Sequence, residues 1–315
     1  MGRGTLKHLD LFSGYGGFTI PASKYGIETI NFSEIDKYAT AVLKYRFPSI
    51  KNLGDITKIK PEDLPDVDLI TGGSPCQDLS VAGKGAGLDG GRSGLFFCFI
   101  NLIKEKQPMY FVWENVKGAL SSSKGWDFAR VQIEMEQAGY DVFWQLLNAK
   151  DFGVPQNRER IFAIGIRKGS GREILFEQRK SEQNPNQIIE GSQGSRVYDD
   201  TMAVSQKALG GGQGAKTGLY AIPTQLGNSK KFGNSKGGDQ AYTLRASNPN
   251  GVIEDMRIRR LTPTECERLM GLEDGWTAKG IVDGKEVEIS DTQRYKMCGN
   301  GVVVNCVDYL YSLLK

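Results

Sequence analysis

The segment "KHLDLFSGYGGF", residues 7–18, decides the fold, because an apolar run is followed at once by a turn with three glycines. The run predicts a short strand, and the glycines let the backbone approach a ligand closely at its end. A dinucleotide fingerprint G-x-G-x-x-G would need glycine at position 19, where the chain has Thr19. The turn is therefore better suited to a nucleoside than to a pyrophosphate, and a helical stretch to about Tyr25 is expected after it.

Strand-like and helix-like segments alternate from this turn to about residue 165. Apolar runs predict further strands at residues 28–34, 67–73, 108–116, 141–149 and 160–168, and helices are expected at residues 37–47 and 94–106. Such alternation favours an α/β fold with a parallel or mixed doubly wound sheet. Ligands of that architecture bind beyond the carboxyl ends of the strands, where the glycine turn and several polar segments of this chain fall.

The composition limits the class of protein. The chain has 315 residues, of which 39% are hydrophobic and 24% charged, and its net charge is +3. No apolar run approaches the ~20 residues that span a bilayer, and the N-terminus lacks the apolar stretch of a signal peptide, so a cytoplasmic protein is expected. The five cysteines include no C-x-x-C and there is one histidine, so neither a disulfide framework nor a metal site is expected.

The composition changes in the second half of the chain. Residues 191–251 are rich in Gly, Ser, Asn and Lys and carry seven Lys or Arg against three Asp or Glu. A flexible linker is one interpretation, but strand-like pieces at residues 218–226 and 240–247 favour a small, loop-rich second lobe. A helix follows that Thr262 caps, with Glu265 closing a capping box. The apolar C-terminal segment predicts a last helix that packs on the main sheet.

A single cysteine stands out in "GGSPCQDLS", residues 72–80, directly after a strand-like run. A thiol is a nucleophile only as its thiolate, and many cysteine enzymes form that thiolate with a histidine base. The one histidine, His8, lies in the first expected strand. If Cys76 is a nucleophile, we therefore expect it to act without a Cys–His pair.

Two carboxylates fit a nucleoside site beside the glycine turn. Glu34 follows Gly14 by twenty residues and ends the second expected strand. A carboxylate at this spacing commonly accepts hydrogen bonds from ribose hydroxyls. Asp55 follows the next strand–helix unit. Together with the turn, these residues favour nucleoside binding over a purely structural turn.

Polar residues at two other strand ends suggest catalysis. Glu114 follows an almost wholly apolar run, and a partly desolvated carboxyl group holds a proton near neutral pH. In "VPQNRERIF", alternate residues of an extended strand face one side, so Gln156, Arg158 and Arg160 are expected to point into one cleft. The two arginines would supply cations for a phosphate or a carbonyl oxygen, and would favour a nearby thiolate.

Taken in order, these segments resemble the cytosine-C5 DNA methyltransferases of bacteria and phages. The resemblance rests on "DLFSGYGGF", "SEID", "GDI", "GGSPCQDLS", "GRSGLF", "ENV", "QNRERIF", "RRLTPTECERLMG" and "GNGVVV". Small departures are Ser13 and Gly301, where the family commonly has alanine. The resemblance implies a catalytic and cofactor-binding domain at residues 1–176, completed by 292–315, a target-recognition domain at 177–256, and a recognition-domain helix and hinge at 257–291.

The resemblance also implies the chemistry. Cys76 would add to C6 of a cytosine, which activates C5 toward the methyl group of S-adenosylmethionine. Glu114 would protonate or hydrogen-bond N3 of the ring, and Arg158 and Arg160 would complete the catalytic set, with Arg160 on the cytosine O2. S-adenosylhomocysteine would be the product. No histidine is required.

The cofactor and DNA contacts carry over position by position. The implied cofactor-binding residues are Phe12, Gly14, Gly16, Glu34, Ile35, Asp55, Ile56, Pro75, Leu95, Asn300 and Val302. The implied DNA-binding residues are Gln77, Ser80, Arg92, Gln156 and Arg245. Double-stranded DNA is the expected partner, its target base flipped out of the helix. A restriction endonuclease that reads the same site is a candidate partner, and a monomer in the bacterial cytosol or nucleoid is expected.

Other functions remain open at this point. An amino-methyltransferase acting on adenine N6 or cytosine N4 would carry a Pro-Pro-aromatic motif where this chain has "SPCQ". A tRNA-methylating branch of the same family shares PCQ and ENV, and the long glycine-rich region favours DNA over tRNA. A catalytically silent DNA-binding regulator would be expected to lose Cys76 or Glu114. Thr19 disfavours a nicotinamide dehydrogenase.

Overall fold

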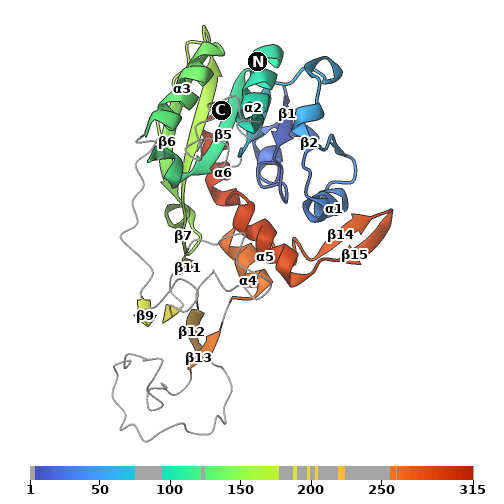
Figure 1. Ribbon diagram of the computed structural model, residues 1–315, viewed down its shortest axis with the longest axis vertical. Helices are drawn as coiled ribbons and strands as arrows, with labels where there is room; N and C mark the ends of the chain where they lie inside the picture. The colour runs from blue at the N-terminus through green and yellow to red at the C-terminus, as the bar shows by residue number, and fades with distance from the viewer. Residues whose placement is uncertain are drawn as a thin grey trace, which may run out of the picture.

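A seven-stranded sheet forms the centre of the molecule (Figure 1). The computed structural model describes residues 4–74, 94–121, 125–176, 187–189, 197–198, 203–204, 219–223, 256–259 and 261–314. The sheet order is β3-β2-β1-β4-β5-β8-β6. Its strands are β1 (Leu6–Leu11), β2 (Ile27–Ser33), β3 (Lys51–Asn52), β4 (Leu69–Gly72), β5 (Tyr110–Val116), β8 (Glu159–Arg167) and β6 (Tyr140–Asn148). The neighbouring pairs from β3 to β5 are parallel, whereas β8 runs antiparallel to both β5 and β6.

Helices cover both faces of this sheet. They are α1 (Lys37–Arg46), α2 (Gly94–Lys106), α3 (Trp126–Gln137), α4 (Pro263–Leu269), α5 (Asp291–Asn300) and α6 (Val304–Ser312). Side chains alternate between faces along β5: Tyr110 and Val112 join a cluster with residues of α1, α5 and α6, whereas Phe111 and Trp113 join a cluster with residues of α2 and α3. The predicted doubly wound α/β fold is therefore confirmed.

The C-terminal helices complete the core beside the first strand. The Tyr311 hydroxyl of α6 donates to the Phe18 carbonyl at 2.8 Å, and Figure 1 shows the red C-terminal segment beside the blue N-terminal strands. The expected packing of the C-terminal helix on the main sheet is confirmed. This closure brings residues from opposite ends of the chain to one side of the sheet.

The helical stretch expected after the glycine turn is confirmed only at its end, next to Tyr25. Successive turns occupy this segment, and only Ala22–Tyr25 form a short 3-10 helix. Gly14 and Gly16 have φ angles of 56° and 88°, in the left-handed region that a right-handed helix cannot contain. The left-handed glycines exclude a helix from the turn itself, and helical structure after it is confined to the single 3-10 turn at Ala22–Tyr25.

A smaller sheet lies apart from the main one in Figure 1. Its order is β13-β12-β10-β9, with β9 (Gln187–Ile189), β10 (Val197–Tyr198), β12 (Leu219–Pro223) and β13 (Met256–Arg259). The strand predicted at residues 218–226 is confirmed by β12, and the one predicted at 240–247 lies outside the described residues. One further strand, β11 (Ala203–Val204), pairs with β7 (Gln156–Asn157) beside the main sheet.

The segment that follows β13 in the chain begins with the expected capped helix. Thr262 accepts the Glu265 N–H and Glu265 accepts the Thr262 N–H, which confirms the capping box on α4. A hairpin that the sequence analysis did not predict follows, formed by β14 (Lys279–Val282) and β15 (Lys285–Glu288). Its turn residues Asp283 and Gly284 both have positive φ, as a two-residue hairpin turn requires.

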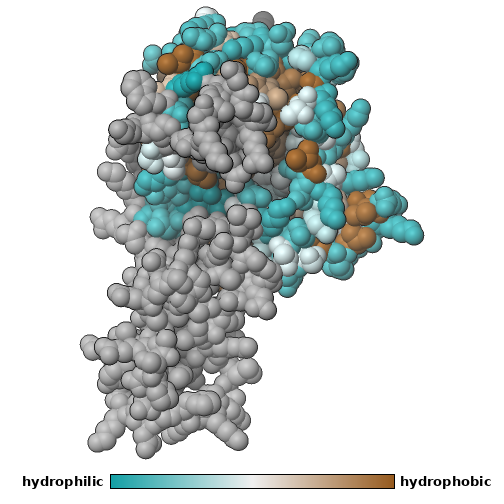
Figure 2. Space-filling model, in the orientation of Figure 1, coloured by the Kyte–Doolittle hydropathy of each residue, from teal (hydrophilic) through white to brown (hydrophobic). Residues whose placement is uncertain are grey.

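The surface is mostly hydrophilic in the view of Figure 2, where hydrophobic residues form small separate patches. The largest exposed fractions among large apolar side chains are 81% at Leu175 and 74% at Ile35. Among the described residues, no helix has both the length and the apolar character needed to cross a membrane.

Candidate active site

The glycine turn and the end of β2 meet through Glu34. The Gly14 N–H donates to Glu34 Oε2 at 2.8 Å, and the Asp36 N–H donates to Oε1 at 2.7 Å. Burial raises the pKa of Glu34, although the hydrogen bonds from these two N–H groups oppose the rise. The twenty-residue spacing seen in the sequence thus corresponds to a direct contact between a carboxylate and the turn.

Close packing fixes the shape of the turn. A Cβ atom on Gly16 would lie 2.8 Å from the Phe47 ring, and one on Gly17 would lie 2.6 Å from a Val302 methyl group. Phe12 has a φ of 54°, which is strained for a residue with a side chain. Strain of this kind persists only where the surroundings impose it, and it is concentrated at functional sites.

The other residues assigned to the cofactor take several environments. Asp55 accepts the Thr57 N–H at 3.0 Å and the Thr57 hydroxyl at 2.8 Å, which hold its pKa below the ordinary value. Ile56 is buried, whereas Ile35 is 74% exposed directly after Glu34. Leu95 is partly buried in the first turn of α2.

The C-terminal segment reaches the glycine turn through Val302. Its carbonyl accepts the Tyr15 hydroxyl at 2.6 Å, so the segment after α5 is fixed to the turn. Asn300 ends α5 with an exposed side chain. Tyr15 is a residue that the sequence analysis did not single out, and its position within the glycine turn was the available signal.

An ion pair lies where β5 and β8 run side by side. Arg160 Nε is 3.0 Å from Glu114 Oε1, and the two side chains are only 16% and 13% exposed. Burial raises the pKa of Glu114, while the charges of Arg160 and Arg158 oppose the rise. The result is a carboxyl group whose proton affinity is set by a balance between burial and nearby cations.

The end of β4 lies directly against this pair. A Cβ atom on Gly73 would be 2.7 Å from Glu114 Oε2, so only glycine fits there without movement. The Trp113 indole N–H donates to the Ser74 hydroxyl at 3.0 Å, and the Asn115 amide donates to the Ser74 carbonyl at 3.2 Å. The chain is thus fixed up to Ser74, two residues before Cys76.

Six of the predicted site residues lie outside the described residues. They are Pro75, Cys76, Gln77, Ser80, Arg92 and Arg245. Sequence reasoning missed Ser74, which precedes Cys76 by two residues, and Trp113 of β5, which binds it. A tryptophan within a buried strand was the signal, because a buried indole N–H needs an acceptor.

The expected common cleft for Gln156, Arg158 and Arg160 is not what the structure shows. Gln156 is fully buried and its amide donates to the Leu269 carbonyl at 2.8 Å. Because Gln156 belongs to the short strand β7 while β8 begins only at Glu159, the three side chains do not share the face of one strand. This burial contradicts the expected DNA contact of Gln156, and we do not propose one.

Arg158 is also buried, with 1% of its surface exposed. Its Nη2 donates to the carbonyls of Gly299 and Gly301, at 3.0 and 2.8 Å. Burial, followed by the charge of Arg160, lowers the pKa of Arg158 to about 9. The arginine therefore fixes the end of α5 behind the active site and acts on Glu114 through its charge.

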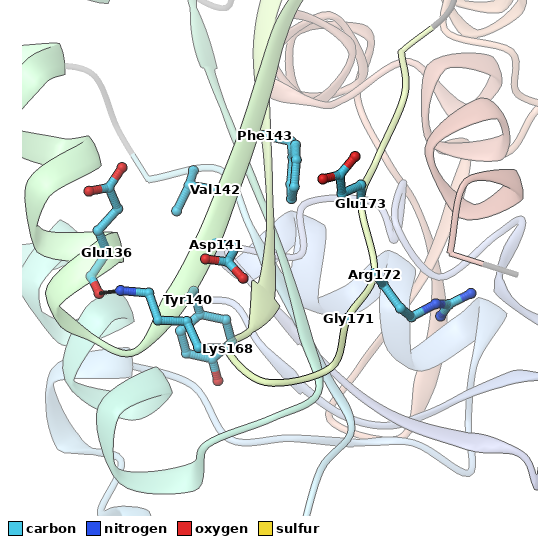
Figure 3. Close-up of a pocket in the computed structure, with 9 residues that line it drawn as sticks. All are labelled: Glu136, Tyr140, Asp141, Val142, Phe143, Lys168, Gly171, Arg172 and Glu173. Carbon is cyan, nitrogen blue, oxygen red and sulfur yellow. Dashed lines mark hydrogen bonds between the residues drawn. The ribbon is translucent and has the colours of Figure 1, made fainter.

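A pocket among the described residues lies away from these side chains. It has a volume of about 810 Å³ and lies beside β6, an edge strand of the main sheet (Figure 3). Its lining residues are Glu136, Tyr140, Asp141, Val142, Phe143, Lys168, Gly171, Arg172 and Glu173. Lys168 donates to the Glu136 carbonyl at 3.2 Å, and Arg172 donates to the Leu314 carbonyl at 3.2 Å. None of the predicted site residues lines this pocket. We therefore assign it no role in the expected methyl transfer.

Comparison with known proteins identifies the family. The family model of the C-5 cytosine-specific DNA methylases matches residues 6–315. The type II methyltransferase M1.ScrFI of Lactococcus lactis subsp. cremoris is 36% identical over 309 residues, which cover 95% of this chain and 75% of that protein. The type II methyltransferase M.HhaI of Haemophilus parahaemolyticus is 31% identical over 345 residues, which cover 97% of this chain and 93% of that protein.

Solved structures share the fold at lower identity. A mutant of DNMT2 from Spodoptera frugiperda superposes with a TM-score of 0.70 at 21% identity, covering 98% of this chain and 99% of that one. An E. coli putative DNA modification methyltransferase encoded within a prophage gives a TM-score of 0.62 at 20% identity, covering 98% and 99%. The family model and the curated relatives decide the assignment: the chain belongs to the C-5 cytosine-specific DNA methylase family and is a DNA cytosine-C5 methyltransferase.

Proposed function

We propose that this enzyme methylates C5 of a flipped-out cytosine in a specific duplex DNA sequence, through a covalent bond between Cys76 and C6. The observation that carries the proposal is the buried Glu114–Arg160 pair against the end of β4. Cys76 follows the fixed residue Ser74 by two positions. A nucleophile, an acid and a cation are thereby contributed by three neighbouring strand ends.

The proposed addition step uses these residues in turn. The Cys76 thiolate adds to C6, while Glu114 gives a proton or a hydrogen bond to N3 and relieves the charge that develops on the ring. Arg160 holds the cytosine O2 and limits the proton affinity of Glu114. After C5 has been methylated, loss of the C5 proton restores the double bond and releases the thiolate.

S-adenosylmethionine is the proposed cofactor and supplies an electrophilic methyl group. The residues around the glycine turn fit it: Ile35 offers an exposed apolar surface, and the adjacent Glu34 offers a carboxylate to ribose hydroxyls. Phe12 on the turn and Asp55 across from it would bind the adenine. We propose the same cofactor role for Gly14, Gly16, Ile56, Pro75, Leu95, Asn300 and Val302.

The domain division and the DNA contacts are part of the proposal. Residues 1–176 with 292–315 would form the catalytic domain, 177–256 would recognise the target, and 257–291 would join them. Gln77, Ser80, Arg92 and Arg245 remain the proposed DNA contacts. Flipping a base out of the duplex costs a few kcal/mol, which protein contacts to the phosphates and the flipped base must offset.

The test uses the purified protein, S-adenosylmethionine and a plasmid of known sequence, followed by bisulfite sequencing. Protected cytosines at one short recurring site are expected. Methyl incorporation into tRNA, with none into the plasmid, would contradict the choice of DNA. A protein that binds plasmid DNA and S-adenosylmethionine but modifies neither nucleic acid would be a silent regulator.

The covalent step is tested with Cys76→Ser. We expect methyl transfer to be abolished while S-adenosylmethionine still binds, because the serine hydroxyl is not ionised at neutral pH. Cys98→Ser is the matched control, since Cys98 is a half-buried thiol on α2 that takes no part in the proposed reaction. Turnover by Cys76→Ser close to that of the control would remove the covalent mechanism.

A further inference from the structure

Five polar side chains are buried beneath the glycine turn. They are His8, Asp10, Thr19, Thr29 and Thr71, and none is more than 8% exposed. They come from β1, β2, β4 and the turn itself. Burial of polar groups costs free energy unless each is hydrogen-bonded, so the arrangement of these side chains needs an explanation.

The five side chains form a closed ring of hydrogen bonds. Thr19 Oγ1 lies 2.8 Å from Asp10 Oδ2 and 3.1 Å from Thr29 Oγ1. His8 connects the next two members, with Nδ1 2.7 Å from Thr29 Oγ1 and Nε2 2.8 Å from Thr71 Oγ1. Thr71 Oγ1 closes the ring 3.4 Å from Asp10 Oδ1. We call this set the β1 ring.

Counting protons shows what the β1 ring requires. Each of its three threonine hydroxyls carries one proton, and a neutral imidazole carries one N–H. An ionised Asp10 beside a neutral His8 therefore gives four protons for five hydrogen bonds, and two acceptors face each other. One further proton supplies all five bonds.

The surroundings favour a position on Asp10, and not on His8, for this fifth proton. Burial lowers the pKa of His8 to about 3 and raises the pKa of Asp10 to about 8, and the charge of Glu34 raises the Asp10 pKa further. The titratable groups that face Asp10 are His8 on its own strand, Glu34 at the end of β2 and Tyr311 on α6. The Tyr311 hydroxyl also contacts the Thr71 side chain, but it donates its own proton to the Phe18 carbonyl and so supplies none to the ring.

Both ends of the glycine turn are hydrogen-bonded to Asp10. At the start of the turn, the Ser13 hydroxyl donates to the Asp10 carbonyl at 2.6 Å. At its end, Thr19 bonds the Asp10 carboxyl group, and the Thr19 N–H donates to the Gly16 carbonyl at 2.9 Å. The ionisation state of the Asp10 side chain therefore acts directly on the Thr19 end of the loop, whereas the main-chain carbonyl of the same residue fixes the Ser13 end.

We propose that Asp10 is a neutral carboxylic acid at neutral pH, that its proton completes the β1 ring, and that Asp10 in this form positions the glycine turn for S-adenosylmethionine. Asp10 is a positioning residue, because it acts on the cofactor through the turn. The positioning role rests on the proposed function, whereas the protonation of Asp10 does not depend on it. Ionisation of the ring removes one of its hydrogen bonds and leaves an unpaired charge beneath the turn.

The pH dependence follows from counting protons in both states. In the unfolded chain, aspartate and histidine titrate near pH ~3.9 and ~6.5, so the pair holds one proton between these values and none above them. The folded ring holds one proton up to a pH of about 8. Folding therefore takes up a proton between about pH 6.5 and 8, and stability falls as the pH rises through that window.

Asp10→Asn isolates this effect, because an amide offers the same donor and acceptor as the neutral acid without a titrating proton. The ratio of the folding constant of the wild type to that of Asp10→Asn is expected to fall about tenfold per pH unit between roughly pH 4.5 and 7.5. The control is Asp66→Asn, whose carboxyl group is fully exposed. A pH-independent ratio, or an Asp10→Asn chain that does not fold, would contradict the neutral acid.

The single histidine of the sequence supplies a second test, which needs no variant. Nitrogen NMR of protein labelled at histidine gives one set of ring signals without further assignment. A neutral ring, with one protonated and one bare nitrogen, is expected in the folded protein at pH 6 to 7. Two protonated ring nitrogens would move the proton to His8 and overturn the neutral Asp10.

The positioning role has its own measurement. The dissociation constant of S-adenosylmethionine is expected to rise by about tenfold per pH unit above about pH 8 for the wild type and to stay constant for Asp10→Asn. Equal pH dependence in the two proteins would leave Asp10 without a positioning role. If neither protein binds S-adenosylmethionine at any pH, the proposed function fails. The folding and NMR measurements still decide whether Asp10 carries the proton.

Discussion

Asp10 on β1 and Glu114 on β5 are carboxyl groups removed largely or wholly from solvent, on strands separated by β4, yet their partners differ. Glu114 Oε1 lies 3.0 Å from Arg160 Nε, and the charge of Arg158 also lowers the pKa of Glu114. Asp10 has two threonine hydroxyls and the charge of Glu34. Burial raises the pKa of both groups, and only at Glu114 do cations oppose it.

Under the two proposals, this difference separates a structural proton on Asp10 from a catalytic one on Glu114. A carboxyl group without cations holds its proton throughout the neutral range, and it suits an anchor that must not titrate during turnover. A carboxyl group balanced between burial and two arginines exchanges its proton more readily, as a general acid must. Burial thus serves two purposes, and the presence or absence of neighbouring cations decides between them.

Glu114→Gln is expected to have the largest effect among the variants that break this comparison. The amide has no proton to transfer to N3, so single-turnover methyl transfer should fall about 10²- to 10⁴-fold. Affinity for DNA should change little, because the amide keeps a hydrogen-bond donor. Glu159→Gln, which alters an exposed partner of Lys117, is the control. An unchanged rate with weakened DNA binding would contradict the role of Glu114 as an acid.

Arg158→Met is expected to act on stability. The change removes a buried cation and both of its hydrogen bonds to the carbonyls of Gly299 and Gly301. Loss of one partner from a buried charged network costs about 3 to 5 kcal/mol of unfolding free energy, measurable by denaturant titration. Arg167→Met at the exposed end of β8 is the matched control. A cost no larger than that of the control would mean that Arg158 does not fix the end of α5.

The sequence predicts the fold well where one physical rule governs a segment. Alternating apolar runs gave the strands of the main sheet, and α2 spans the predicted residues 94–106. The capping box at Thr262 was predictable because its side chains bond only to their own local backbone. The unpredicted hairpin carried a signal too, since Asp283 and Gly284 are typical of a two-residue turn.

Predictions failed where contacts distant in sequence decide the outcome. The spacing of Gln156 and Arg158 resembles one face of a strand, but each is bound to a backbone carbonyl more than a hundred residues away. The β1 ring was not predictable for the same reason, because Thr71 is 61 residues from Asp10. The Glu34 contact was predictable because a twenty-residue spacing reflects one strand–turn–strand unit.

Glu34 sharpens the comparison as a third, half-buried carboxyl group, with neither cations nor hydroxyls as its first partners. Backbone N–H groups of Gly14 and Asp36 bind it instead. Glu34→Gln would place an amide NH₂ against one of these N–H groups, at a cost of about 1.5 to 3 kcal/mol in stability and S-adenosylmethionine binding combined. Calorimetry of cofactor binding, with Glu28→Gln on the same strand as the control, measures the effect. Unchanged binding and stability would remove Glu34 from the cofactor site.

Arg160→Lys tests the balance at Glu114 with the smallest expected effect, since a cation remains near the carboxyl group. Lysine lacks the Nε donor that lies 3.0 Å from Glu114 Oε1, and loss of this hydrogen bond leaves the pKa of Glu114 higher than in the wild type. In the proposed mechanism the active form is protonated Glu114, so the rate is expected to fall as the pH rises through this pKa. The pH at which methyl transfer declines should therefore move upward in Arg160→Lys, and stay in place in Arg167→Lys. A downward shift would mean that the ionised carboxylate, and not the acid, is the form that acts on the cytosine ring.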